Sequence, residues 1–340
     1  MRAPPLPIVW TSANIRGYGV ANKGSTAPEM GACRCLDSCF ERIGSMSSLH
    51  QLQDGRVLGY EEYGASDGRA TLFYFHGTPG ARLEWRLFGG EMAARRLGVR
   101  VIATDRPGMG LSTFQPGRRL RDWPLDVLSL ADHLRLEKFS VLGCSGGGPY
   151  ALVCAVAAAD RLAAVGVVAG LAPLDQPGVV AGMGGTVRRF LQLARAQPAL
   201  CRSFLRMLDG AAHKQPGLLL RATKAGPDRA VMANPDVQQA FLAEIREALR
   251  GGPCGAQLDA AIVASPWGFQ LEDIPVPVHL WHGEQDRNVP AAMGRYLAVS
   301  IPASHATFYR DEAHLSLMRH HAHDILVALG GASDGGGTDL

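Results

Sequence analysis

Short apolar runs alternate with amphipathic stretches along this chain from about Ser48 onward. The first two runs flank Asp54-Gly55, and an Asp-Gly pair between runs of alternating character is a strong β-hairpin signal. Most later runs are almost entirely apolar, which is typical of strands buried on both faces of a parallel sheet. Strands are expected at residues 49–53, 56–63, 71–75, 99–103, 139–143, 163–169, 276–282 and 303–309.

Stretches with helical apolar spacing separate most of these runs. Strands that alternate with helices predict an α/β fold, with a mostly parallel eight-stranded sheet that carries helices on both faces. The run 276–282 contains Pro277, and proline inside a strand predicts strain or a place near a sheet edge. Helices are expected at residues 83–97, 123–136, 149–159 and 290–299, with a last helix that ends near residue 329.

The strand signal disappears between about residues 172 and 270. Helical stretches replace it, and Pro198 and Pro235 stand where the first turn of a helix tolerates proline. The pattern predicts a helical cap, residues 172–270, inserted between two parts of one core, 48–171 and 271–329. Its helices are expected at residues 186–196, 198–208, 218–224 and 235–249.

The two ends of the chain lack sustained periodicity. Residues 1–47 are rich in Pro, Gly and Ser and are expected to form a disordered leader, and translation from Met46 would fit the point where the pattern starts. Cys33, Cys35 and Cys39 lie in this stretch, but a metal site would need a fourth ligand that the sequence does not offer. Residues 330–340 are expected to form a disordered tail.

Composition and charge narrow the classes of function. The chain has 340 residues, 47% of them hydrophobic and 19% charged, so it can build a large core. A net charge of +3 is too small to imply nucleic acid or an anionic membrane as partner. No run approaches the ~20 apolar residues of a membrane span. Seven cysteines without framework spacing indicate a cytoplasmic protein with reduced thiols. The expected partner is a small-molecule substrate.

A glycine-flanked serine follows the fifth expected strand, in Gly143-Cys-Ser-Gly-Gly147. This is the G-x-S-x-G spacing of a nucleophile elbow, in which a sharp strand-to-helix turn exposes the serine hydroxyl. Close neighbours in such a turn must lack side chains, because strand and helix almost touch there. The helix that follows directs its positive end toward Ser145, where an oxyanion would form.

Ser145, Asp286 and His314 occur in this order, each just past an expected strand. The carboxyl ends of strands in such a sheet form its ligand site. A serine hydroxyl is a poor nucleophile until a base takes its proton, so His314 is the expected general base and then general acid. Asp286 would hold the imidazole in the required tautomer and stabilise its protonated form.

Other residues compete for these roles. Glu284 precedes Asp286 by two positions and is the alternative acid, while His305 is expected to be structural. Cys144 occupies the position before the elbow tip, so its side chain is expected to pack in the core. Three further histidines on the last helix suit a solvated face better than a metal site: His320, His321 and His323. Neither a metal nor a cofactor is expected.

An oxyanion hole needs two backbone donors directed at one point. Gly146, which follows the nucleophile, is expected to supply one N–H, and the loop at residues 76–80 the other. Thr78 is the expected donor in that loop, since Pro79 has no N–H. His76 is expected to order the loop and not to titrate in catalysis.

The region from Ser48 to Leu329 resembles the α/β-hydrolase superfamily. The His-Gly-x-Pro-Gly loop is most similar to the branch that contains proline iminopeptidases, although those carry Trp where this chain has Gly146 and usually a Gly before the histidine where it has Glu312-Ala313. The serine at the elbow sets the chain apart from relatives with an aspartate nucleophile. The matching motifs are His76-Gly-Thr-Pro-Gly80, Asp105-Arg-Pro-Gly-Met-Gly-Leu-Ser112, Gly143-Cys-Ser-Gly-Gly147, Gly283-Glu-Gln-Asp286 and Asp311-Glu-Ala-His314.

These observations predict a serine hydrolase that cleaves a carboxylic ester or related acyl compound through an acyl-enzyme. Trp267 and Phe269, with Met183, are expected to line an apolar substrate pocket. Two alternatives remain open. An aminopeptidase would need a carboxylate in the cap to hold an ammonium group, and Asp259 and Glu244 are candidates that the sequence does not distinguish from solvated charges. The other alternative is a non-enzymatic small-molecule binder on the same fold.

Overall fold

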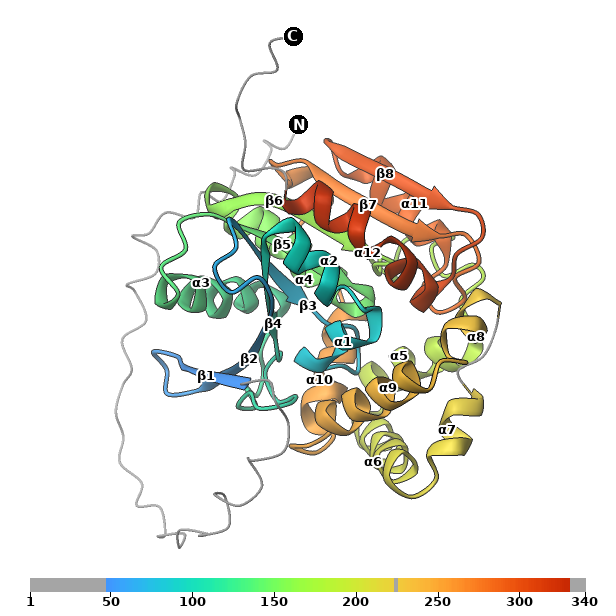
Figure 1. The fold of residues 1–340 in the computed structure, drawn as a ribbon. Coiled ribbons are helices and arrows are strands. Elements are labelled where there is room, and N and C mark those ends of the chain that lie inside the picture. The colour runs from blue at the N-terminus through green and yellow to red at the C-terminus, as the bar shows by residue number, and fades with distance from the viewer. Residues whose placement is uncertain (1–46, 223–225, 331–340) are drawn as a thin grey trace, which may run out of the picture. The chain divides into compact units, whose positions relative to one another are not determined.

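The structure is a computed structural model that describes residues 47–222 and 226–330 (Figure 1). Apart from residue 47, the expected leader lies outside the described residues, together with its cysteine cluster. Residues 331–340 of the expected tail lie outside them as well.

Eight strands form one sheet, in the order β1-β2-β4-β3-β5-β6-β7-β8. Strand β2 runs antiparallel to β1 and β4, and all other neighbours are parallel. The mostly parallel α/β fold expected from the sequence is therefore confirmed. The strands are β1 (Ser47–Gln51), β2 (Val57–Gly64), β3 (Ala70–Phe75), β4 (Val99–Thr104), β5 (Phe139–Cys144), β6 (Leu162–Val168), β7 (Val278–Gly283) and β8 (Ser304–Tyr309).

Helices cover both faces of the sheet. Successive strand residues point to opposite faces, and here the residues on both faces are apolar and need to be buried. Phe73 and Phe75 belong to a core that includes α3, α4 and α11, whereas Leu72 and Tyr74 belong to a core that includes α2 and α12. No helix in the described part of the chain is both long and apolar enough to cross a membrane. These helices are α1 (Trp85–Phe88), α2 (Glu91–Leu97), α3 (Trp123–His133), α4 (Gly148–Ala157), α11 (Ala291–Ser300) and α12 (His314–Gly330).

The segment 172–270, which we call the inserted segment, follows β6 and precedes β7 in the sequence. It contributes helices α5 to α10 (Figure 1). Two of them, α8 and α10, were not expected. Helix α10 is buried on several sides among other helices, so its residues show no amphipathic period. The bounds are α5 (Gly185–Ala196), α6 (Pro198–Lys214), α7 (Pro216–Ala222), α8 (Pro227–Val231), α9 (Pro235–Ala248) and α10 (Cys254–Val263).

One sequence expectation about local structure was wrong. The helix expected at 83–97 is divided, because Gly89 has a left-handed φ of 63° that ends α1, and α2 starts at Glu91. The proline-containing strand lies near a sheet edge, as expected, since β7 pairs with β6 on one side and with the edge strand β8 on the other. It avoids strain by beginning at Val278, directly after Pro277.

Candidate active site

Ser145 lies at the turn between β5 and α4, with a φ of 55° that is rare for a residue with a side chain. The flanking glycines are required by close backbone contacts. A Cβ on Gly143 would lie 2.2 Å from the carbonyl oxygen of Gly147, and a Cβ on Gly147 would lie 2.1 Å from that of Phe75. The local backbone thus has the strained, tightly packed form that the G-x-S-x-G spacing predicts.

His314 and Asp286 lie together beyond the ends of β8 and β7. His314 Nδ1 is 2.7 Å from Asp286 Oδ2, and the Asp286 side chain is buried. Asp286 Oδ1 accepts the N–H groups of Asn288 and Val289, at 2.8 and 2.9 Å. One carboxylate oxygen is therefore held by its own loop, and the other is left to orient the imidazole.

The ionisation of His314 is controlled by this contact. Burial disfavours the charged imidazolium, but the adjacent carboxylate of Asp286 outweighs burial and raises the pKa of His314 to about 9. The same contact assigns a proton to Nδ1, so Nε2 is the ring atom that loses its proton when the imidazole becomes neutral.

The inserted segment supports the position of His314. Asp228, on α8, accepts the N–H groups of Leu315 and Ser316, both at 2.9 Å. These N–H groups belong to the first turn of α12, which begins at His314 and has no intrahelical acceptors for them. The sequence analysis did not single out Asp228, because its partners lie more than eighty residues away in the chain.

The alternative acid and the other histidines lie elsewhere. Glu284 is half-exposed and pairs with Arg295 at 2.7 Å. His320 and His321 contact Glu312, and the ring of His305 lies tilted against that of His279, with centroids 5.2 Å apart. Cys144 is buried, and burial raises the pKa of its thiol well above the ordinary value. This environment suits the packing role expected for Cys144.

Three backbone polar groups at the start of the loop after β3 are paired with buried side chains. Arg106 donates to the carbonyl oxygens of His76 and Gly77, and the Gly77 N–H donates to Glu84 Oε2 at 2.8 Å. Within the described residues, no acceptor is hydrogen-bonded to the N–H of Thr78. A Cβ on Gly146 would lie 3.2 Å from Thr78 N, so the two expected oxyanion donors are close neighbours.

His76 is part of this framework. It is fully buried, its Nε2 accepts the Arg106 N–H, and its Nδ1 contacts the Gly77 carbonyl oxygen at 2.7 Å. Burial, reinforced by the nearby charge of Arg106, lowers the pKa of His76 well below its ordinary value. The ring is neutral and orders the loop, as the sequence predicts.

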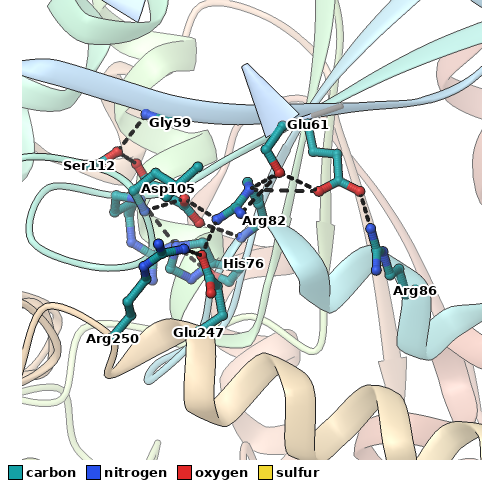
Figure 2. Close-up of polar contacts among 12 residues, drawn as sticks. Gly59, Glu61, His76, Arg82, Arg86, Asp105, Ser112, Glu247 and Arg250 are labelled. Carbon is teal, nitrogen blue, oxygen red and sulfur yellow. Dashed lines mark hydrogen bonds and ion pairs between the residues drawn. The ribbon is translucent and has the colours of Figure 1, made fainter. Parts of the chain in front are cut away.

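A second buried network holds the loop after β4 against the inserted segment (Figure 2). Arg82 Nη1 contacts Asp105 Oδ2 and Glu247 Oε1, each at 2.7 Å, and Glu247 belongs to α9. Glu61 lies beside Arg82 and Arg86 in the same view. Buried charges are tolerated only when paired, and here the pairing joins helix α9 to the sheet.

A cavity of about 140 Å³ brings the expected site residues together. Thr78, Ser145, Gly146 and His314 all line it. Its other walls come from the inserted segment and the neighbouring loops: Leu171, Val187, Phe190, Leu191, Asn288 and Val289.

Trp267 and Phe269 are not among the lining residues of this cavity, and neither is Met183. Trp267 is buried, packs against Phe269 and donates its indole N–H to the Val263 carbonyl oxygen. The apolar wall comes instead from α5, where Val187, Phe190 and Leu191 recur at helical spacing. That periodicity was visible in the sequence, but which helix face meets the serine was not.

The two candidate ammonium ligands are buried and not solvated. Asp259 is fully buried and Glu244 is 3% exposed. Burial, with Glu84 as a neighbouring carboxylate, raises the pKa of Glu244 well above its ordinary value and so favours the uncharged acid. Neither residue lines the cavity that holds Ser145.

A family model for the alpha/beta hydrolase family matches residues 72–328. The chain belongs to this family. This alpha/beta hydrolase is 25% identical over 248 residues to the bifunctional esterase/perhydrolase DCH of Acinetobacter calcoaceticus, and the match covers 70% of this chain and 82% of the relative. A 36% identical match of 120 residues to the dihydrolipoyllysine-residue acetyltransferase component of the acetoin cleaving system of Pseudomonas putida covers 34% of this chain and 30% of that relative.

Solved structures have the same fold as this alpha/beta hydrolase. A hydrolase from Pseudomonas aeruginosa PA01 superposes with a TM-score of 0.62 at 23% identity, over 84% of this chain and 98% of that one. A thermophilic esterase from Thermogutta terrifontis superposes with a TM-score of 0.58 at 21% identity, over 84% and 97%. The relatives support hydrolase activity. The proline iminopeptidase branch stays a resemblance in sequence motifs.

Proposed function

We propose that the protein is a cofactor-independent serine hydrolase that cleaves a carboxylic ester or a related acyl compound. The observation that carries this proposal is the placement of Ser145 and His314 on one cavity, with His314 bonded through Nδ1 to the buried Asp286. Serine nucleophile, imidazole base and orienting carboxylate are the three parts that such a reaction requires. The names of the related esterase and hydrolase enzymes support the same class.

In the first half of the reaction, His314 Nε2 takes the proton of the Ser145 hydroxyl while Ser145 Oγ attacks the ester carbonyl carbon. The carbonyl oxygen becomes an oxyanion that accepts hydrogen bonds from the N–H groups of Gly146 and Thr78. His314 then gives its proton to the departing alkoxide, so the alcohol leaves and the acyl group stays on Ser145.

In the second half, His314 removes a proton from water, and the hydroxide attacks the acyl carbonyl carbon. The oxyanion forms again in the same hole, and it collapses with cleavage of the bond to Ser145 Oγ. His314 returns the proton to that oxygen, and the carboxylic acid is released. Asp286 stays ionised throughout and stabilises the imidazolium that forms twice.

The cavity favours a small acyl or alcohol group. Its volume of about 140 Å³ is similar to that of engineered cavities of about 150 Å³ that hold benzene. Apolar side chains of α5 form one wall, so the group bound there is expected to be apolar. Short-chain aliphatic or small aromatic esters are the proposed substrates.

An aminopeptidase activity is less well supported. The Asp259 carboxylate already accepts hydrogen bonds from two arginines and from two neighbouring hydroxyl groups. Glu244 favours its uncharged form, and neither residue lines the cavity. A substrate ammonium group would therefore find no free carboxylate from these two residues.

The test is Ser145→Ala, assayed with a panel of p-nitrophenyl esters of increasing chain length. Turnover is expected to fall by about 10⁴-fold or more, and labelling by a fluorophosphonate probe should disappear with it. Ester hydrolysis that survives in the variant would refute the nucleophile assignment. A wild-type protein that binds esters without hydrolysing them or reacting with the probe would support a non-enzymatic binder.

A further inference from the structure

The loop at residues 76–80, which carries the Thr78 N–H, is called the oxyanion loop. Its orientation depends on one buried guanidinium. Arg106 is fully buried, and its Nη2 donates to the Gly77 carbonyl oxygen at 2.7 Å. In a trans peptide the C=O and N–H point in opposite directions. A donor fixed on the Gly77 carbonyl oxygen therefore turns the Thr78 N–H away from Arg106, on the peptide edge that faces Gly146.

A buried guanidinium needs an opposite charge, and the inserted segment supplies it. Asp259, on α10, accepts from Arg106 Nε at 2.9 Å with Oδ1 and from Arg106 Nη2 at 2.7 Å with Oδ2. The same carboxylate accepts from Arg118 at 2.6 Å and from the Tyr150 hydroxyl at 2.7 Å. Burial alone would raise the pKa of Asp259, but Arg106 and Arg118 hold it well below its usual range.

Asp259 also contacts the oxyanion loop directly. The Thr78 hydroxyl donates to Asp259 Oδ2 at 2.5 Å, and the same hydroxyl lies 3.0 Å from Arg106 Nη2. Thr78 is thus held at its side chain by the inserted segment, while Arg106 orients the peptide before it.

Helix α10 is seated tightly at this point. A Cβ on Gly255, in its first turn, would lie 2.0 Å from the carbonyl oxygen of Gly108. Gly108 follows Arg106 by two residues in the loop after β4. This contact places the backbone of α10 directly on the loop that carries Arg106, so Asp259 and Arg106 meet across a packed interface.

We propose that Asp259 is a positioning residue for the oxyanion hole: through Arg106 and Thr78 it holds the Thr78 N–H in the direction of Ser145. The inserted segment then contributes to the chemical step as well as to substrate binding. This inference rests on the proposed hydrolase function, and it predicts that loss of Asp259 lowers kcat much more than it changes KM.

The experiment compares Asp259→Asn and Thr78→Val with wild type in steady-state ester hydrolysis and in binding of an alkylboronic acid. The boronic acid forms a tetrahedral adduct with a catalytic serine and so reports on the oxyanion hole. Misplacing or losing one donor costs about 10²-fold in rate. We expect kcat to fall about 10²-fold in Asp259→Asn and about tenfold in Thr78→Val, with KM within about threefold. Boronate affinity should fall in parallel with kcat.

Two further variants separate positioning from folding. Thr78→Ser keeps the hydroxyl and should recover most of the loss seen in Thr78→Val, which also decides the matter if Asp259→Asn does not fold. Glu247→Gln is the matched control, because Glu247 is likewise a carboxylate of the inserted segment on a core arginine, Arg82. Its hydrogen bonds reach neither Thr78 nor Arg106, and kcat should stay within about threefold of wild type.

The inference is overturned if folded Asp259→Asn and Thr78→Val retain wild-type kcat and boronate affinity, or if Glu247→Gln loses as much as Asp259→Asn. An increase in KM with unchanged kcat would also contradict the inference, since it would place Asp259 in substrate binding. Failure of the proposed function has a different signature, because Ser145→Ala would then remain active.

Discussion

Asp286 Oδ2 lies 2.7 Å from His314 Nδ1, and the other oxygen of Asp286 is held by two backbone N–H groups of its own loop. The carboxylate therefore has little freedom to rotate away from the imidazole. Glu284, two residues earlier, is turned outward to Arg295. The distinction between two acids that are close in sequence follows from the turn after β7, which directs only one of them into the interior.

This contact makes the activity depend on pH in a defined direction. His314 must be neutral to accept the Ser145 proton, and Asp286 raises its pKa to about 9. The value of kcat/KM should therefore increase as pH rises through that range. In Asp286→Asn the raising charge is lost while burial remains, so the acid limb should move to lower pH and the plateau should fall by about 10³-fold or more.

The measurement is kcat/KM between pH 5 and 10 for both proteins, with Glu284→Gln as the matched control. Glu284 is half-exposed and bonded to Arg295, so its replacement should leave the limb and the plateau in place. A limb that stays put in Asp286→Asn, or one that moves in Glu284→Gln, would contradict the assignment of Asp286.

Acyl-chain selectivity should be controlled by α5. Phe190→Ala removes an aromatic ring from the cavity wall and should admit longer chains. One methylene in a hydrophobic pocket is worth about 10-fold or more, so the ratio of kcat/KM for hexanoate over acetate esters should rise by about tenfold. Phe269→Ala removes the same ring from a site outside the cavity and should leave that ratio unchanged. A changed ratio only in Phe269→Ala would restore the substrate-binding role first expected for Phe269.

The elbow should not tolerate even one methyl group. Gly147→Ala would place Cβ 2.1 Å from the Phe75 carbonyl oxygen, a backbone atom in a buried strand end. Overpacking of this kind should lower the free energy of unfolding by about 3 kcal/mol or more. Gly210→Ala, in the middle of α6, meets no atom within 4 Å and should raise it by about 0.5–1 kcal/mol. Urea unfolding of both variants provides the measurement, and a Gly147→Ala protein as stable as wild type would refute the close approach.

Local patterns predicted the features that depend on neighbours in the chain. Asp54-Gly55 predicted the hairpin of β1 and β2, and the structure pairs these strands antiparallel. The glycines around Ser145 predicted a turn that only small residues fit, and the backbone contacts explain why. In both cases the backbone conformation is set by a few adjacent residues, so the local sequence is enough to predict it.

Other features depend on contacts between distant segments, and the sequence analysis missed them. Helix α10 shows no amphipathic period because its surroundings are apolar on several sides. Asp259 appeared to be one of many solvated charges, yet it is fully buried against Arg106 and Arg118. Trp267 and Phe269 were expected to line an apolar substrate pocket, but they do not line the cavity that holds Ser145, where residues of α5 form the apolar wall.

By itself, the sequence determined the α/β class and the candidates Ser145, Asp286 and His314, because strand endings and glycine spacing are local properties of the chain. Only the tertiary structure decided what surrounds those candidates. Thr78 and Asp259 are separated by 181 positions, and their hydrogen bond exists because α10 packs against the loop that follows β4. Periodicity along the chain does not predict such a contact, since the contact depends on how two elements pack against each other in space.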